Sequence, residues 1–360
     1  MKLAFYAPMK PPDDPVPSGD RRMAQLLIRA LTLGGHEVGI ASRLRARDGK
    51  GDRVVQEKIR ARALATAARL VGHYKADRPD LWFTYHVYHK APDWLGPAVS
   101  RVLRIPYVIC EASFAPKRAG GPWDMGHTQA EMAISRADAV IGLNSHDAAC
   151  VAPLLKPGAK MIALRPFLDT APFDKPHTVN ATPRLLAVAM MRDGDKLESY
   201  RVLAAALAKL GDLEWGLTVV GDGPARREIE RLFGARAKFM GEVAEKRLPE
   251  IYAAANVYVW PSVREAYGMA LLEAQASGLP AVAGNVGGVP DILRDGETGL
   301  LAREGDADDF AAKLRALLTD PARRAAMGAR AREVAVAEHS LPAAAAALDA
   351  VIRALCKVAA

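Results

Sequence analysis

The chain has 360 residues, half of them hydrophobic and a quarter charged, and it carries a net charge of +8. This length and composition are typical of a soluble globular protein with two domains. The three scattered cysteines form no C-x-x-C pair, which argues against a zinc site and favours a reducing compartment. No apolar run has the length of a secretory signal or a membrane span, so we expect a cytoplasmic protein.

Short apolar runs alternate with helical stretches along the chain. The runs of the first half cover residues 3–6, 36–41, 81–85, 107–110, 139–143 and 161–164, with a helix expected over 20–33. Those of the second half cover 184–189, 216–220, 238–240, 257–260 and 280–283, and helices follow from residue 306. Runs of this kind are typical of buried parallel strands, so the alternation predicts an α/β protein with parallel sheets.

The alternation occurs in two rounds that a proline-rich segment separates. We predict an N-terminal Rossmann-like domain over residues 1–165, a linker over 166–183 and a C-terminal Rossmann-like domain over 184–335. Residues 336–360 are expected to form a helix that packs back towards the N-terminal domain. Two such domains would face a central cleft, and open parallel sheets bind ligands beyond the carboxyl ends of their strands.

Tyr85 and His86 end the third predicted strand. One interpretation is an aromatic, hydrogen-bonding wall for the acceptor of a transferred group. A partly buried structural cluster is the alternative. His89 lies three residues after His86, but no third ligand is near, so a metal site is the weakest of the three interpretations.

Two cations, Arg192 and Lys196, follow the first strand of the second half and flank Gly194. They suit a diphosphate, because Arg binds phosphate oxygens through two donors and Lys acts as a point charge. The alternative is a solvated loop, since two aspartates lie between these cations.

Two glutamates form the most informative pattern of the chain. Glu265 lies in a loop after a predicted strand, and Glu273 lies two turns into a helix that begins near Tyr267. The free N–H groups of this helix start favour a diphosphate, and Gly268 lets the backbone approach it closely. We assign Tyr267, Gly268 and Met269 to the donor, Glu273 to ribose hydroxyls and Glu265 to hydroxyls of the transferred sugar. The alternative is that both glutamates are ordinary surface carboxylates.

This pattern resembles the donor-site signature of retaining glycosyltransferase family four, which has the GT-B fold. The resemblance extends over residues 184–300 and includes VVGDGPARREIE, LPEIYAAANVYVWPS and GGVPDILRDGETGLL, whereas over 1–165 it is mostly architectural. It implies that Glu273 holds the nucleotide ribose and that Glu265 contacts the sugar or its phosphate. It also implies that Arg192 and Lys196 hold the pyrophosphate, although the family loop has one more residue between these cations.

The resemblance also bears on the first half of the chain. It implies that Gly19 lies in a glycine-bearing loop near the donor phosphates and the acceptor. Many family members place a histidine after the fourth strand, in contact with the transferred sugar, where this chain has Glu111. The candidates for that contact are Glu111 and His127, which is expected in a loop, and a structural role is the alternative for both.

The activity that the resemblance implies is retaining, metal-independent transfer of a sugar from a nucleotide-diphosphate donor to an acceptor hydroxyl. The acceptor is a glycan, a lipid-linked molecule or a small molecule, and no cofactor or metal is expected because the two cations take the metal's place. Two alternatives stay open: a nucleotide-sugar epimerase on the same fold and a non-catalytic subunit that binds sugar nucleotides.

Positive charge is concentrated in the first half of the chain. Residues 1–175 contain 26 Lys and Arg against 17 Asp and Glu, and the remainder contains 23 against 24. A solvated surface is one explanation, and peripheral contact with an anionic membrane at its inner face is the other. Nothing resembles a nucleic-acid recognition module, so we expect no nucleic-acid partner.

Overall fold

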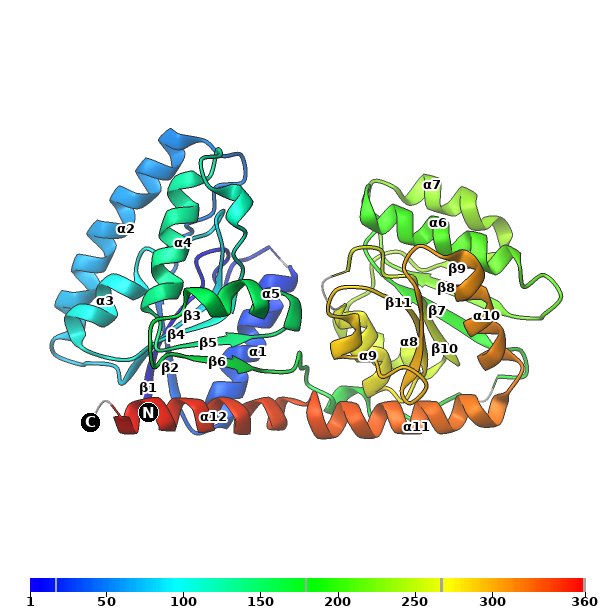
Figure 1. Cartoon of the computed structure of the whole chain (residues 1–360). Coiled ribbons are helices and arrows are strands. Elements are labelled where there is room, and N and C mark those ends of the chain that lie inside the picture. Colours follow the sequence, from blue (N-terminus) through cyan, green and yellow to red (C-terminus); the bar gives the residue numbers. More distant parts are fainter. Residues whose placement is uncertain (17, 179, 266–267, 359–360) are drawn as a thin grey trace. The chain divides into compact units, whose positions relative to one another are not determined.

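The computed structural model describes residues 1–16, 18–178, 180–265 and 268–358 and contains two compact units (Figure 1). The N-terminal unit combines residues 1–164 with the C-terminal stretch that begins at Leu341, and the C-terminal unit spans Arg165–Ser340. Each unit is a parallel sheet covered by helices, which confirms the predicted α/β class with two Rossmann-like sheets.

The N-terminal unit contains a six-stranded parallel sheet in the order β2-β1-β3-β4-β5-β6. Its strands are β1 Lys2–Tyr6, β2 Glu37–Ser42, β3 Leu81–Val87, β4 Tyr107–Ala112, β5 Ala139–Gly142 and β6 Lys160–Ala163. Its helices are α1 Gly19–Leu33, α2 Arg53–Tyr74, α3 Gly96–Leu103, α4 Asp124–Arg136, α5 Ser145–Val151 and α12 Leu341–Val358, with short 3-10 turns at Pro116–Arg118 and Ala152–Leu154.

The apolar runs of β1, β3 and β4 follow from their central position in this sheet. Nearly all of their residues are buried, because helices cover both faces of a parallel sheet. The edge strands β2 and β6 are only partly buried. Helix α12 packs against α1, and its Leu348 and Ile352 are buried there.

The C-terminal unit also contains a six-stranded parallel sheet, with the strand order β12-β11-β10-β7-β8-β9. Its strands are β7 Arg184–Val188, β8 Gly216–Val220, β9 Ala237–Phe239, β10 Val257–Trp260, β11 Ala281–Asn285 and β12 Gly299–Arg303. Its helices are α6 Asp195–Ala208, α7 Arg226–Phe233, α8 Leu248–Ala253, α9 Met269–Ala276, α10 Ala307–Leu318 and α11 Pro321–Glu338, with 3-10 turns at Ala171–Phe173, Gly234–Arg236, Glu245–Arg247 and Val289–Asp291.

Two features of the C-terminal unit differ from the sequence-based expectations. The edge strand β12 was missing from the predicted runs, because its apolar run is confined to Leu300–Ala302, directly after Gly299. There a Cβ atom would lie 2.5 Å from the Ala281 carbonyl oxygen. The proline-rich segment after Arg165 also packs within this unit: Phe173 is buried, and Thr178 donates a backbone hydrogen bond to Ala253.

Candidate active site

The predicted donor residues of the C-terminal unit come from the carboxyl ends of two neighbouring strands. Strand β7 leads to Arg192 and Lys196, and strand β10 leads to Glu265. Because β7 and β10 pair directly and in parallel, their following loops leave the sheet at the same edge. The topology therefore brings the two cations and this carboxylate to one place.

Lys196 and Glu265 form an ion pair that Trp260 supports. Lys196 Nζ contacts Glu265 Oε2, and the indole Nε1 of Trp260 donates to the same oxygen at 3.2 Å. The Lys196 ammonium also lies 5.4 Å from the centre of the Trp260 ring, within cation–π range. The Lys196 and Glu265 side chains are 27% and 16% exposed, so a ligand can reach them. Sequence reasoning missed Trp260, the last residue of β10.

Cross-links between α6 and the loop after β10 fix the position of Glu265. The Val263 backbone N–H donates to Ser199 Oγ at 3.0 Å, and Arg264 Nε pairs with Asp195 Oδ1 at 2.7 Å. Ser262 and Arg264 both adopt left-handed backbone conformations, with φ of 57° and 48°. Such strain is concentrated at functional loops in proteins.

The start of α9 carries two of the predicted donor residues. Gly268 caps this helix with φ of 72°, and its cap includes no side-chain hydrogen bond; Met269 follows half-buried. Tyr267, the third predicted donor residue here, lies outside the described residues.

Glu273 lies within α9 and is buried, with 2% of its surface exposed. The Tyr252 hydroxyl of α8 donates to Glu273 Oε2 at 2.9 Å and fixes the orientation of the carboxylate. Glu273 is therefore not an ordinary surface carboxylate. Its assignment to ribose stays a prediction, and Tyr252 is a partner that the sequence pattern did not indicate.

Arg192 is exposed on the loop after β7, which packs tightly against the glycine-containing turn after β8. A Cβ atom on Gly221 would lie 1.9 Å from the Ala189 carbonyl oxygen, and one on Gly223 would lie 2.3 Å from that of Met191. The Met191 N–H donates to the Asp222 carbonyl at 2.9 Å. The two glycines therefore allow this turn to hold the Arg192 loop.

A second cluster lies at the carboxyl edge of the N-terminal sheet. The pairing of β3 with β4 places His86 opposite Glu111, and both have left-handed backbones with φ of 63° and 64°. His86 Nδ1 pairs with Asp20 Oδ1 at 2.7 Å. Burial alone would lower the pKa of His86, but the charges of Glu111 and Asp20 raise it above its usual value. Sequence reasoning missed Asp20, which lies in the first turn of α1.

Glu111 sits in an environment that disfavours its charge. Burial raises the pKa of Glu111, against the opposing effect of the His86 charge. Its Oε2 atom is buried without a hydrogen-bond partner among the described residues. The neighbouring Tyr85 is buried in β3.

The structure places the two other N-terminal candidates on helices. His127 lies in the first turn of α4, so its expected loop position was wrong: it is buried, its Nε2 lies 3.2 Å from the Ala115 carbonyl oxygen, and its ring packs on Phe114. Gly19 is the first residue of α1, and a Cβ atom there would meet nothing within 4 Å. The backbone at Gly19 is therefore open to close approach.

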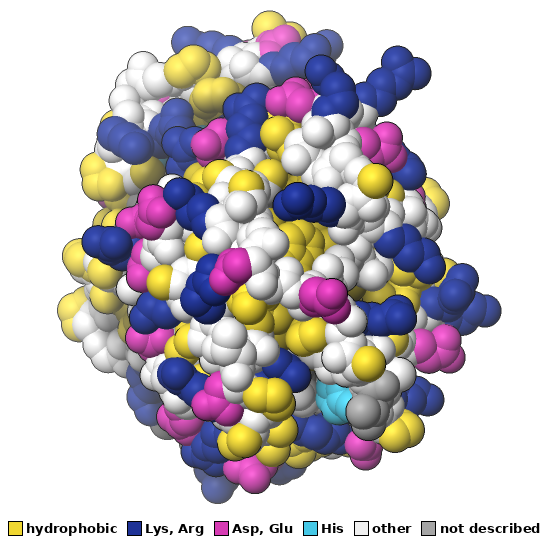
Figure 2. Space-filling view, turned by 90° about the vertical axis from the view of Figure 1, so that its right-hand side faces the viewer, with side chains coloured by type: hydrophobic (Ala, Val, Ile, Leu, Met, Phe, Trp, Pro, Cys, Tyr) yellow, Lys and Arg dark blue, Asp and Glu magenta, His cyan; other side chains and the backbone are white. Residues whose placement is uncertain are grey.

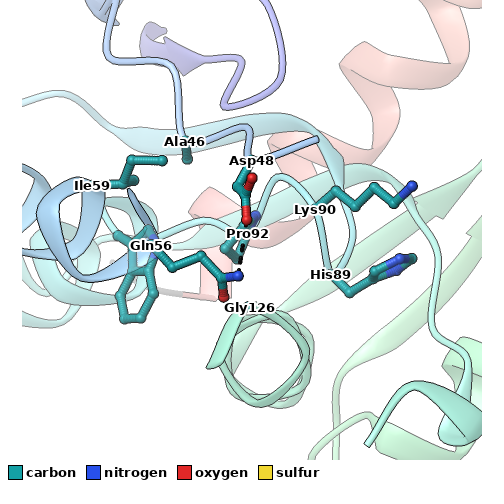
Figure 3. Close-up of a pocket in the computed structure, with 9 residues that line it drawn as sticks. Ala46, Asp48, Gln56, Ile59, His89, Lys90, Pro92 and Gly126 are labelled. Atoms are coloured by element: carbon teal, nitrogen blue, oxygen red, sulfur yellow. Dashed lines mark hydrogen bonds between the residues drawn. The ribbon is translucent and has the colours of Figure 1, made fainter. Parts of the chain in front are cut away.

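A small pocket lies among the loops that follow β2 and β3 and the helices α2 and α4 (Figure 3). Gln56 of α2 donates to Asp48 at 2.9 Å across it, and both side chains are buried. His89 and Lys90 line the same pocket, and the Lys90 ammonium lies over the Trp123 ring at 4.6 Å. The carboxyl edge of this sheet therefore carries both an acidic side chain, Asp48, and a basic one, Lys90.

Two absences concern the described part of the chain. No group of three or more His, Cys, Asp or Glu side chains there could hold a metal ion, and metal independence of the reaction stays a prediction. No helix within the described ranges has the length and apolar character that crossing a membrane requires.

Comparison with known proteins finds similarity over the C-terminal unit. Residues 182–320 match the family Glycosyl transferases group 1. Sulfoquinovosyl transferase SQD2 of Arabidopsis thaliana is 40% identical over 38% of this chain and 27% of its own length. D-inositol 3-phosphate glycosyltransferase of Rhodococcus opacus is 34% identical over 49% of this chain and 42% of its own length. The matched parts thus cover less than half the length of these curated relatives.

The fold comparison extends over both units. The crystal structure of Anabaena HepE in complex with UDP covers 99% of this chain and 100% of its own, with a TM-score of 0.75 and 16% sequence identity. At this identity the likeness concerns the fold alone. The chain therefore has the GT-B fold, and residues 182–320 of its C-terminal unit are similar to the Glycosyl transferases group 1 family.

Proposed function

We propose that the chain transfers a sugar from a nucleotide diphosphate to an acceptor hydroxyl, with retention at the anomeric carbon and without a metal ion. The observation that carries this proposal is the Lys196–Glu265 pair, which lies beside Arg192's loop at the adjoining ends of β7 and β10. The family match over residues 182–320 supports the same reaction class.

Each donor residue receives a role from its chemistry. Arg192 and Lys196 bind the diphosphate, and the free N–H groups at the start of α6 lie next to them. The phosphates replace Glu265 as the counter-charge of Lys196, which lets the Glu265 carboxylate accept hydrogen bonds from the sugar hydroxyls. Glu273, held by Tyr252, accepts from the ribose hydroxyls.

The reaction needs charge stabilisation more than a side-chain nucleophile. As the bond between the anomeric carbon and the diphosphate oxygen breaks, negative charge grows on the leaving group, and the two cations stabilise it. The acceptor oxygen forms the new bond on the same face and passes its proton to the departing phosphate oxygen. The acceptor binds at the carboxyl edge of the N-terminal sheet, where His86 and Glu111 lie.

Product analysis tests this proposal. The full chain is incubated with UDP, GDP and ADP sugars and a panel of glycan, lipid-linked and small acceptors. Acceptor-dependent release of the nucleoside diphosphate supports transfer, whereas an altered but intact sugar nucleotide identifies an epimerase. Binding without turnover on every acceptor identifies a non-catalytic subunit. The anomeric configuration of the product, read by NMR, tests retention, and activity in excess chelator tests metal independence.

Variants connect the activity to the proposed site. Lys196→Ala should lower kcat by about 100-fold or more, because it removes a cation from the leaving group. Lys246→Ala, an exposed lysine of the same unit, is the matched control and should retain full activity. Equal activity of the two variants would remove Lys196 from the mechanism.

A further inference from the structure

Helix α2 (Arg53–Tyr74) presents apolar side chains on two opposite faces. Ala63 and Ala67 are buried against the N-terminal unit, which accounts for one face. On the outward face, Val54 is 57% exposed, and Ala61, Ala65 and Ala68 follow it at intervals of seven, four and three residues. A surface helix of a globular protein normally carries polar residues there. We call the outward row of Val54, Ala61, Ala65 and Ala68, with the neighbouring Leu64 at 52% exposure, the crest.

Cations flank this crest on both sides. Lys58, Arg62 and Arg69 are spaced to lie along one side, and Arg53 and Arg60 lie along the other; all five are exposed. The one acidic residue of the helix, Glu57, lies four residues before Ala61 beside the crest, where it pairs with Arg53 at 3.1 Å. The helix therefore carries a net charge of +4 around an apolar row.

This pattern differs from the charged surface of the C-terminal unit. On α7, Arg226 pairs with both Asp222 and Glu230 at 2.7 Å. The space-filling view likewise shows lysine and arginine side chains interspersed with acidic ones (Figure 2). On α2, Arg53 pairs with Glu57 and Arg60 lies 5.7 Å from the centre of the Trp94 ring. Lys58, Arg62 and Arg69 have no acidic partner among the described residues, so these three cations are available to an anionic partner.

We propose that α2 docks on a membrane surface that contains anionic phospholipid, with its crest at the boundary of headgroups and acyl chains and its cations on the lipid phosphates. An apolar row between two rows of cations is the arrangement that such a surface accommodates. Nucleic acid suits it less, because the crest would set methyl groups against phosphates and exclude the cations from the centre of contact. This docking does not depend on the sugar-transfer chemistry.

Co-sedimentation of the full chain with vesicles tests the proposal. Vesicles of phosphatidylcholine alone are compared with vesicles that also contain phosphatidylglycerol, at low and high salt and without any sugar nucleotide. The chain should bind the anionic vesicles and not the neutral ones, and salt should weaken the binding. Lack of binding, or equal binding to both vesicles, overturns the proposal and leaves the glycosyltransferase activity to be judged separately by product release.

Two sets of substitutions locate the contact. Charge reversal of Lys58, Arg62 and Arg69 to Glu should weaken binding by about 100-fold or more, at about fivefold per cation. Val54→Gln with Leu64→Gln should weaken it by about tenfold, because less apolar surface is buried. All of these side chains are exposed, so circular dichroism and thermal unfolding should match the wild type.

A matched control reverses three exposed cations of the C-terminal unit, Arg227, Arg323 and Lys246, and should bind as the wild type does. Loss of binding in this control, with normal binding in the α2 variants, would place the contact elsewhere and refute the proposal. Weakening by charge reversal but not by the glutamine pair would refute insertion of the crest. Tighter binding to duplex DNA than to anionic vesicles would refute lipid as the partner.

Discussion

Gly221→Ala should disturb the loop that carries Arg192. The added Cβ would lie 1.9 Å from the Ala189 carbonyl oxygen, and Gly221 has φ of 132°, where residues with a Cβ are strained. Backbone strain of about 1–2 kcal/mol and overpacking of about 1–3 kcal/mol together predict destabilisation by about 2–5 kcal/mol. Relief of the clash requires Ala189 to move. Because Arg192 lies three residues further along the same loop, it should be displaced as well.

Gly216→Ala is the matched control, because Gly216 begins β8, the strand that Gly221 follows, and an added Cβ there meets nothing within 4 Å. This substitution should leave stability unchanged or raise it by about 0.4–1 kcal/mol. Urea unfolding measures the stability of both variants. Titration with nucleoside diphosphates measures whether the Arg192 loop still binds its ligand. Gly221→Ala should unfold at lower urea and bind the diphosphate more weakly. Stability of Gly221→Ala within about 0.5 kcal/mol of the wild type would refute the packing argument.

Three further outcomes are expected. Trp260→Phe keeps an aromatic face for Lys196 but removes the donor to Glu265, so steady-state kcat/KM should fall by about tenfold; an unchanged value would dismiss Trp260 as a positioning residue. Glu273→Gln still accepts from Tyr252, so its Tm should stay near that of the wild type while the KM for donor rises by about 10–100-fold; a large Tm loss with unchanged KM would make Glu273 purely structural. His86→Gln removes an ion pair whose histidine has a raised pKa and whose partner, Asp20, has a lowered pKa. The contribution of this pair to the free energy of unfolding is fully present below the usual histidine pKa of 6.5. It is lost as pH rises through the raised pKa of His86. It is also lost as pH falls through the lowered Asp20 pKa. Thermal unfolding against pH should therefore separate wild type and variant at mildly acidic pH and bring them together at alkaline pH; a constant gap would contradict the pKa shift.

The fold could be predicted because buried parallel strands are continuous apolar runs in the sequence. Strand β12 was missed because its apolar run is confined to the three residues Leu300–Ala302. The site residues Lys196 and Glu265 were found through their place after strands. Trp260 and Tyr252 were missed because an aromatic residue near a strand end or in a helix is usually core, and only the three-dimensional contact shows the carboxylate it serves. His127 was placed in a loop because glycine and proline precede it, yet it lies in α4.

The most direct test of the central claim is the preference of the chain for nucleoside diphosphates over monophosphates, measured by calorimetry for UDP against UMP and for the GDP and ADP pairs. If Arg192 and Lys196 hold the diphosphate, the wild type should bind one diphosphate at least about tenfold more tightly than its monophosphate. Arg192→Ala with Lys196→Ala should then bind both about equally, while its affinity for the monophosphate stays near that of the wild type. A double variant that keeps the full preference for the diphosphate would contradict the proposed donor site.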